Sequence, residues 1–172
     1  MVPVVDNLGM RAADRHTIEE LGLPSLVLME QAAASVNAAV EERTESTDLV
    51  VVLCGRGNNG GDGLAMARQR HASAGLVEAV LVADPGELSQ DAAVQWELAG
   101  RFGVPRRVLT EEGLPALEEL LKKAPVVVDA LYGTGLDRAL SGLPAQVVEL
   151  INTVDGEVVA VDIPSGLSGN SG

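Results

Sequence analysis

Three polar residues, Asn59, Asp129 and Asp162, stand where predicted loops follow apolar runs, and their side chains suit work on protons or cations. A carboxylate at the end of a parallel strand projects into a cleft, where it can coordinate a cation or move a proton. Together with Ser165, Asn59 and Asp129 offer oxygen ligands from three loops. With backbone carbonyls added, these oxygens could hold one monovalent cation, although nothing in the spacing selects potassium over sodium or magnesium. In the alternative interpretation, each aspartate caps its own loop by accepting backbone N–H groups.

A glycine cluster within residues 49–64 (LVVVLCGRGNNGGDGL) predicts a strand, an anion-binding loop and a helix in succession. Glycines let backbone N–H groups approach a ligand closely, and a helix N-terminus favours an anion. Gly55, Gly57 and Gly60 spell the dinucleotide fingerprint GxGxxG, and Asp84 follows near the place of a ribose-binding acid. A tight strand–helix turn without a ligand is the alternative.

The glycine cluster carries more polar side chains than that fingerprint needs, namely Asn58, Asn59 and Asp62. A carboxylate beside a pyrophosphate is electrostatically unfavourable unless it contacts a hydroxyl or a cation. Residues 133–135 (GTG) predict a second anion-binding loop, with Arg138 near enough to contact a phosphate, or else a simple strand–helix turn.

Composition excludes several classes of protein. The chain has 172 residues, of which 47% are hydrophobic but only 2% aromatic, and its formal net charge is −13. Such a charge argues against a nucleic-acid or acidic-membrane partner, and few aromatics are available to stack on bases. Neither a signal peptide nor a run of 18 apolar residues is evident, so we expect a cytoplasmic protein. A single cysteine excludes an internal disulfide.

The pattern of apolar residues predicts one α/β domain. Two helices come first, at residues 6–21 and 25–43, and strands then alternate with helices. The strands are expected at 49–54, 77–82, 105–109, 126–130 and 157–161, and the helices between them at 61–74, 89–102, 114–123 and 143–154.

Continuously apolar strands indicate a parallel sheet covered on both faces. We therefore expect a Rossmann-like, three-layer α/β/α fold with a mostly parallel sheet in the order 3-2-1-4-5. Ligands of such sheets bind at the carboxyl ends of the strands, beside the point where the strand order reverses. The loops at 55–62, 129–138 and 162 meet at that point, which predicts a single site.

Three segments of the chain carry a resemblance to a known family. Residues 55–63 (GRGNNGGDG), 127–142 (VVDALYGTGLDRALSG) and 161–166 (VDIPSG) resemble the NAD(P)H-hydrate epimerases, the YjeF N-terminal domain family. Residues 22–34 (GLPSLVLMEQAAA) also resemble the N-terminal helices of that family.

The resemblance implies a Rossmann-like fold and an isomerase of nicotinamide nucleotide repair. Members interconvert the R and S epimers of hydrated NADH and NADPH, which carry a hydroxyl on C6 of the nicotinamide ring. A partner dehydratase accepts the S form. The resemblance also implies that members bind potassium and that the protein forms a homodimer. It does not distinguish hydrated NADH from hydrated NADPH as the substrate.

The resemblance further assigns residues by motif. Potassium would be bound by Asn59, Asp129 and Ser165, and Asp162 is our candidate for the acid/base group. The hydrated dinucleotide would contact Asn58, Asn59, Gly60, Gly61, Asp62, Gly133, Thr134, Gly135, Leu136, Asp137, Arg138, Ala139 and Asp162.

Two departures from the family pattern stand out. Arg56 replaces a proline found in many members, and the chain ends at Gly172, where family domains continue with further strands and a helix. We therefore expect one domain over residues 1–172 that lacks its last strands. A non-catalytic dinucleotide-binding or scaffold module is the alternative function, and a nicotinamide dehydrogenase ranks last because no second domain is present to hold a hydride acceptor.

Overall fold

A computed structural model describes residues 6–136 and 138–170 of the chain. Five parallel strands form one sheet in the order β3-β2-β1-β4-β5, as the sequence predicts. The strands are β1 (Val50–Cys54), β2 (Val77–Leu81), β3 (Arg106–Val108), β4 (Val126–Ala130) and β5 (Glu157–Ala160).

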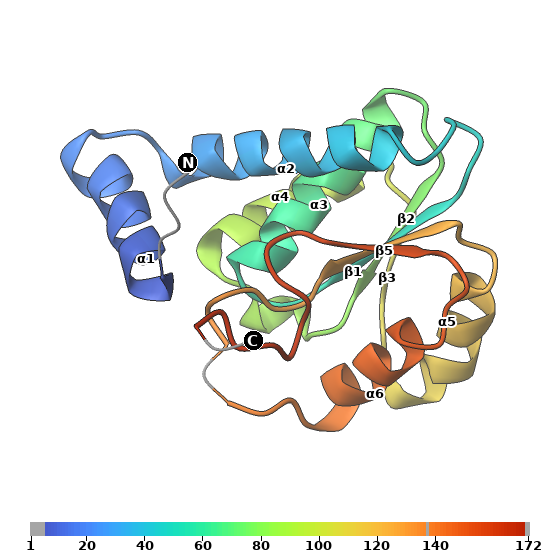
Figure 1. The fold of residues 1–172 in the computed structure, drawn as a ribbon. Helices are drawn as coiled ribbons and strands as arrows, with labels where there is room; N and C mark the ends of the chain where they lie inside the picture. Colours follow the sequence, from blue (N-terminus) through green and yellow to red (C-terminus); the bar gives the residue numbers. More distant parts are fainter. Residues whose placement is uncertain (1–5, 137, 171–172) are drawn as a thin grey trace.

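Helices cover both faces of the sheet (Figure 1). One face packs against α2 (Ser25–Glu41), α3 (Asn58–Ala72) and α4 (Gln90–Arg101), and the other against α5 (Leu114–Leu121) and α6 (Gly142–Ile151). Short 3-10 helices lie at Pro85–Glu87 and Glu111–Gly113. Among the described residues, no helix is long and apolar enough to cross a membrane.

The central strands are apolar because both of their faces are buried. Val50, Val52 and Cys54 of β1 point into the core under α2–α4, whereas Val51 and Leu53 point into the core under α5 and α6. All five residues of β1 and of β4 are buried. The edge strand β5 differs, because its first two residues are exposed to solvent.

Glu30 of α2 links three helices. Its carboxylate accepts hydrogen bonds from Gln69 Nε2 of α3 and Gln95 Nε2 of α4, each at 2.9 Å, and it pairs with Arg68. A partly buried carboxylate with this many donors fixes the relative positions of the helices it joins. This network holds α3, whose N-terminus faces the predicted site, in place against α2 and α4.

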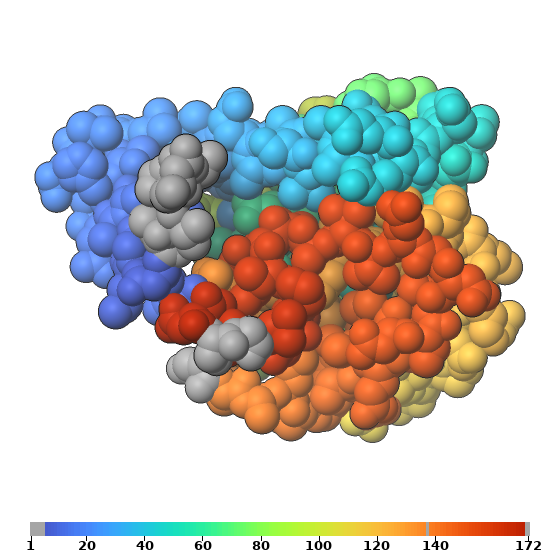
Figure 2. Space-filling model, in the orientation of Figure 1, coloured from blue at the N-terminus to red at the C-terminus, as the bar shows by residue number. Residues whose placement is uncertain are grey.

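The first helical segment differs from its prediction in two ways. α1 (Asn7–Arg15) is followed by a π-helical turn at His16–Glu20 instead of one α-helix over 6–21. No residue of α1 is buried, and Leu8 is 74% exposed, so its apolar stripe does not join the core. In Figure 2, the dark-blue atoms of α1 stand at one end of the molecule.

Candidate active site

Helix α3 begins at Asn58, three residues earlier than the sequence predicts, so residues 58–61 (NNGG) form its first turn. A glycine-rich stretch is a poor helix former, yet here close packing requires glycine. A Cβ on Gly60 would collide with the Gly55 carbonyl, and one on Gly61 would press against Met29 of α2. The N–H groups of a first helical turn have no partners within the helix and attract an anion. The N-terminus of α3 therefore opens at the carboxyl end of β1.

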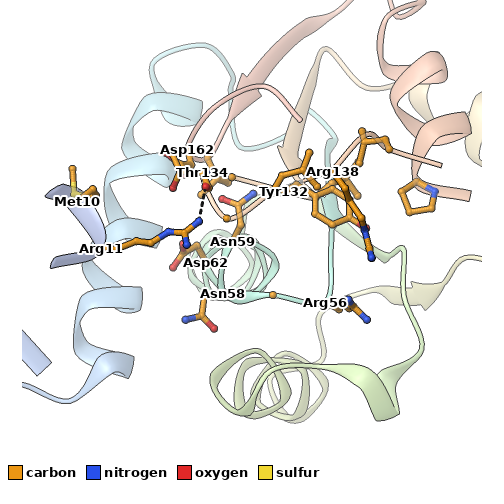
Figure 3. A pocket seen from close by; sticks show the side chains of 18 of the residues that line it. Met10, Arg11, Arg56, Asn58, Asn59, Asp62, Tyr132, Thr134, Arg138 and Asp162 are labelled. Carbon is orange, nitrogen blue, oxygen red and sulfur yellow. Dashed lines mark hydrogen bonds between the residues drawn. The ribbon is translucent and has the colours of Figure 1, made fainter. Parts of the chain in front are cut away.

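A cavity of about 820 Å³ lies at this end of the sheet (Figure 3). Its wall is formed by α1, one residue of α2, the β1–α3 loop with the start of α3, the segment between β4 and the start of α6, and the segment that follows β5. This volume is within the range of small-molecule and cofactor sites. The cavity lies where the order of the sheet reverses between β1 and β4, as expected for this type of sheet.

Asp162 is fixed in the cavity wall by the second glycine loop. Its Oδ2 accepts the Thr134 N–H at 2.7 Å, a short charge-assisted hydrogen bond. Gly133 packs so closely that a Cβ at that position would collide with Asp162 Oδ2. The loop that the sequence assigns to an anion thus positions a carboxylate, while the remaining residues of the loop line the cavity.

Asp62 lies in the second turn of α3 and lines the same cavity. Burial, together with the nearby charges of Asp162 and Asp14, raises the pKa of Asp62 to about 7. Around neutral pH this carboxyl is therefore partly protonated. A carboxyl group with such a pKa can donate as well as accept a proton under physiological conditions.

Asp129 is buried and does not line the cavity. Its Oδ1 accepts the Leu131 N–H at 3.1 Å and the Ser165 hydroxyl at 2.7 Å, and its Oδ2 accepts the Ser165 N–H at 2.8 Å. The Ser165 hydroxyl in turn accepts the Tyr132 N–H at 2.9 Å. Asp129 and Ser165 therefore join the segment after β4 to the segment after β5. This arrangement of Asp129 matches the alternative interpretation of the sequence, in which the aspartate caps its own loop by accepting backbone N–H groups.

The two ends of the cavity differ in charge. In Figure 3, Arg56 and Arg138 lie on one side of the view, and Asp62 and Asp162 lie on the other. Arg56 forms a 3.5 Å ion pair with Glu87, and both side chains are largely exposed. The end with Arg56 and Arg138 is suited to phosphate groups. At the other end Arg11 lies beside Asp62 and Asp162, and the carboxyl groups there, with Asp14, outnumber it, which suits an uncharged or cationic group.

Comparison with known proteins agrees with this geometry. Residues 25–172 match the family described as YjeF-related protein N-terminus. The chain belongs to this family. A protein of Limosilactobacillus fermentum named NAD(P)H-hydrate epimerase is 38% identical over 163 residues, which cover 95% of this chain and 74% of that protein. The bifunctional NAD(P)H-hydrate repair enzyme Nnr of Thermofilum pendens is 40% identical over 95% of this chain and 31% of its own length.

A solved structure shows the same fold. The crystal structure of yeast ynu0, YNL200c, superimposes with a TM-score of 0.78 at 26% sequence identity and covers 96% of this chain and 72% of that one. The Rossmann-like arrangement predicted from the sequence is thereby confirmed.

Most residues that the family resemblance assigns to the substrate line the cavity. They are Asn58, Asn59, Asp62, Gly133, Thr134, Gly135, Leu136, Arg138, Ala139 and Asp162. Gly60 and Gly61 instead lie buried behind the wall, where they support the helix turn. Asp137 lies outside the described residues. Asp84 does not line the cavity and instead caps a 3-10 helix by accepting the Gly86 N–H at 2.7 Å, so it does not take the place of a ribose-binding acid in this site.

Sequence reasoning missed the contribution of α1 to the site. Met10, Arg11 and Asp14 line the cavity, although the spacing places Met10 on a core-facing stripe and the other two on a solvent-facing side. Arg11 Nη2 donates to the Thr134 carbonyl at 2.9 Å, and Asn7 Nδ2 donates to the same oxygen at 3.3 Å. Nothing in the amphipathic pattern distinguishes a helix that covers a cavity from one that packs on a core.

Proposed function

We propose that this domain is an NAD(P)H-hydrate epimerase, which interconverts the R and S forms of hydrated NADH and NADPH. The decisive observation is that the carboxyl group of Asp162 and the N-terminus of α3 meet in one cavity of cofactor size. The proposal is supported by relatives that are 38% to 40% identical and bear names of NAD(P)H-hydrate epimerase or repair enzymes. The domain belongs to nicotinamide nucleotide repair, and its S product is the substrate of a dehydratase.

The charges of the cavity orient the substrate. The pyrophosphate lies at the N-terminus of α3, near Arg56 and Arg138, where backbone N–H groups and guanidinium groups compensate its charge. The hydrated nicotinamide ring lies at the other end, between Asp62, Asp162 and the α1 residues. This orientation keeps the carboxylates away from the phosphates and brings the reacting carbon to Asp162.

Asp162 moves the proton that epimerisation requires. Inversion at C6 needs either loss and return of the hydroxyl or opening and closure of the ring, and each route transfers a proton near that carbon. Asp162 is held within the wall by the Thr134 N–H, so its free carboxylate oxygen is available to the substrate.

Potassium is part of the proposal, with Asn59, Asp129 and Ser165 as the residues that would hold it. The side-chain nitrogen of Asn59 is buried without a hydrogen-bond partner. If the amide group is flipped about its last torsion, the side-chain oxygen of Asn59 takes the buried position of the nitrogen. In that position the oxygen would be available as a ligand for a cation. Asp129 and Ser165 supply a carboxylate and a hydroxyl that touch each other. When bound, the cation would neutralise the Asp129 charge and stabilise the loops that shape the site.

Epimerisation is tested with partly hydrated NADH and an excess of an S-specific dehydratase. The dehydratase consumes the S form at once, and the remaining R form then yields NADH only as fast as it epimerises. Wild type is expected to accelerate this second phase, and more so with potassium than with sodium. Asp162→Asn is expected to lose at least about 100-fold of the acceleration, because a positioned proton-transfer group contributes that much or more.

A matched control separates the site from general charge effects. Asp155→Asn changes net charge equally, but Asp155 is exposed in the turn before β5 and does not line the site cavity. This variant should keep the wild-type rate. A folded wild-type domain that gives no acceleration would contradict the epimerase proposal, and the non-catalytic binding module would then be the remaining function.

Light scattering of the same samples tests whether the domain forms a homodimer. The cytoplasmic location stays a prediction.

A further inference from the structure

The cavity wall offers few groups that can exchange protons near neutral pH. Its described ionisable side chains are three carboxyl groups, three guanidinium groups and one phenol, namely Asp14, Asp62, Asp162, Arg11, Arg56, Arg138 and Tyr132. Arginine does not give up its proton in proteins. Neither histidine of the chain is among the residues that line the cavity. The Tyr132 phenol lies beside Arg138, on the side of the cavity away from Asp162 (Figure 3). The carboxyl groups are therefore left to move protons at the Asp162 end.

We propose that Asp62 and Asp162 act as an acid/base pair on the reacting carbon, with Asp62 as the proton donor and Asp162 as the proton acceptor. This inference rests on the epimerase function proposed above and assigns a second catalytic residue to it. The two residues come from different elements, since Asp62 belongs to α3 and Asp162 follows β5. Figure 3 shows them on the same side of the cavity, above and below the Arg11 guanidinium.

The surroundings of the two carboxyl groups assign their roles. Asp162 accepts the Thr134 N–H at 2.7 Å through Oδ2, so its other carboxylate oxygen is left to accept a proton from the substrate. Among the described residues, no backbone N–H donates a hydrogen bond of this kind to the Asp62 carboxyl group, which is partly buried in the wall. Burial is the largest cause that raises the pKa of Asp62, and with the charges of Asp162 and Asp14 the value reaches about 7. Two carboxyl groups whose environments differ in this way provide one acid and one base.

Both chemical routes to epimerisation need such a pair. If the hydroxyl leaves, Asp62 protonates it, the C6–O bond breaks to release water, and the ring nitrogen's lone pair forms a C=N bond. Water then adds to the opposite face of C6 and gives its proton to Asp162, and the pair is restored by proton exchange with solvent. If the ring opens, Asp162 takes the hydroxyl proton, a carbonyl forms at C6, and the C6–N1 electron pair goes to nitrogen, which takes the proton from Asp62. Rotation and reversal of these steps on the other face restore both groups.

The charged groups facing Asp62 predict how the pair responds to mutation. Asp14 and Arg11 face it from α1, and Asp162 faces it from the end of β5. Removing the negative charge of Asp162 stabilises the ionised form of Asp62, so its pKa falls in Asp162→Asn. Asp14→Asn shifts that pKa in the same direction. Each of these two variants should therefore lower the pH at which Asp62 loses its proton. This shift can be measured even if the variant retains little activity.

The test measures kcat/KM for the R epimer as a function of pH. In wild type, kcat/KM should fall about tenfold per pH unit above about pH 7, because the protonated form of Asp62 is lost. In Asp62→Asn, kcat/KM should be at least about 100-fold lower than in wild type at neutral pH. The residual kcat/KM should not show the fall above about pH 7, because the group that loses its proton is absent. Asp155→Asn, the charge-matched control, should reproduce the wild-type profile. Thermal unfolding establishes that each variant is folded.

A second readout does not depend on activity. NMR titration of the side-chain carboxyl carbons in wild type should show one aspartate with a pKa near 7 that disappears in Asp62→Asn. In Asp162→Asn the same resonance should titrate at lower pH. If wild type is active and a folded Asp62→Asn keeps its full rate, the role of Asp62 is overturned while the epimerase function stands. If wild type does not epimerise the substrate, the function falls and the acid/base pair falls with it.

Discussion

At the level of single residues, Asp162 is held in place as much by a glycine as by its hydrogen bond. A Cβ at position 133 would collide with Oδ2 of Asp162 and lie 3.0 Å from its Cβ and Cγ atoms. In Gly133→Ala the carboxylate must therefore leave its position on the Thr134 N–H. Because a displacement of about 1 Å at a reacting group lowers rates by up to about 100-fold, we expect kcat/KM to fall by that order.

Gly135→Ala is the matched comparison for this substitution. Gly135 belongs to the same loop, but a Cβ there meets nothing within 4 Å, and its φ is not in the left-handed region. Its effect on kcat/KM should be at least tenfold smaller than that of Gly133→Ala. Equal effects of the two substitutions would show that the loop tolerates no side chain and that contact with Asp162 is not the reason.

At the level of elements, α1 is attached to the rest of the domain by few contacts. It buries none of its residues, and its described bonds to the loop after β4 converge on the Thr134 carbonyl. We expect Arg11→Ala to lower kcat/KM about tenfold, because Arg11 both lines the cavity and holds α1 against that loop. The free energy of unfolding should change by less than about 0.5 kcal/mol, since the Arg11 side chain is exposed.

The control for Arg11→Ala lies on the same helix. Arg15 is exposed and does not line the cavity, so Arg15→Ala should leave both kcat/KM and the free energy of unfolding within error of wild type. Steady-state kinetics and urea unfolding of the two variants provide the comparison. A loss of stability in Arg11→Ala that accounts for its loss of activity would show that α1 is a structural element and not a wall of the site.

The elements that the sequence predicts best are those whose patterns are set by local physics. Apart from Asp129, the buried strands β1 and β4 are apolar, and the alternation of strands and helices restricts the sheet to a parallel, doubly wound order. The start of α3 is harder to predict, because the glycines of its first turn are required by close contacts in the folded chain, with the Gly55 carbonyl of the preceding loop and with Met29 of α2. The position of α1 depends on a bond to Thr134 that no local pattern contains.

Within the candidate site, too, some features follow from the local sequence and others depend on contacts that form only in the folded chain. Residues at loop ends, such as Asp162 and Thr134, follow from strand order alone and do line the cavity. Asp129 stands at an equivalent place but turns inward, because Leu131 and Ser165 offer it donors. The raised pKa of Asp62 requires the burial of its side chain and the charges of residues 14 and 162, which only the folded chain brings together.

At the level of the whole molecule, Asp62 links the proposed chemistry to stability. Its pKa rises from the usual 3.8 to about 7 on folding, so between these pH values the folded state binds more protons at this site than the unfolded state. The stabilising contribution of the protonated form is thus complete below about pH 3.8 and is lost as pH rises through about 7. Above that pH, folding retains an ionised carboxyl group in a poorly solvated position within a chain of net charge −13.

Asp62→Asn should therefore stabilise the domain at alkaline pH, even though it removes a proposed catalytic group. At pH 8 we expect its free energy of unfolding to exceed that of wild type by at least about 1 kcal/mol, a figure that allows for partial solvent screening of the shift. Near pH 4 the difference should largely vanish, because folded wild type then carries the proton.

Urea unfolding at both pH values measures this change, and Asp155→Asn supplies the same change in net charge at an exposed position. If the two variants gain equal stability at pH 8, general charge repulsion explains the gain, and the ionisation of Asp62 is not unusual. A gain confined to Asp62→Asn would show that the domain sacrifices stability to keep this carboxyl group in the site, as expected for a residue retained for its chemistry.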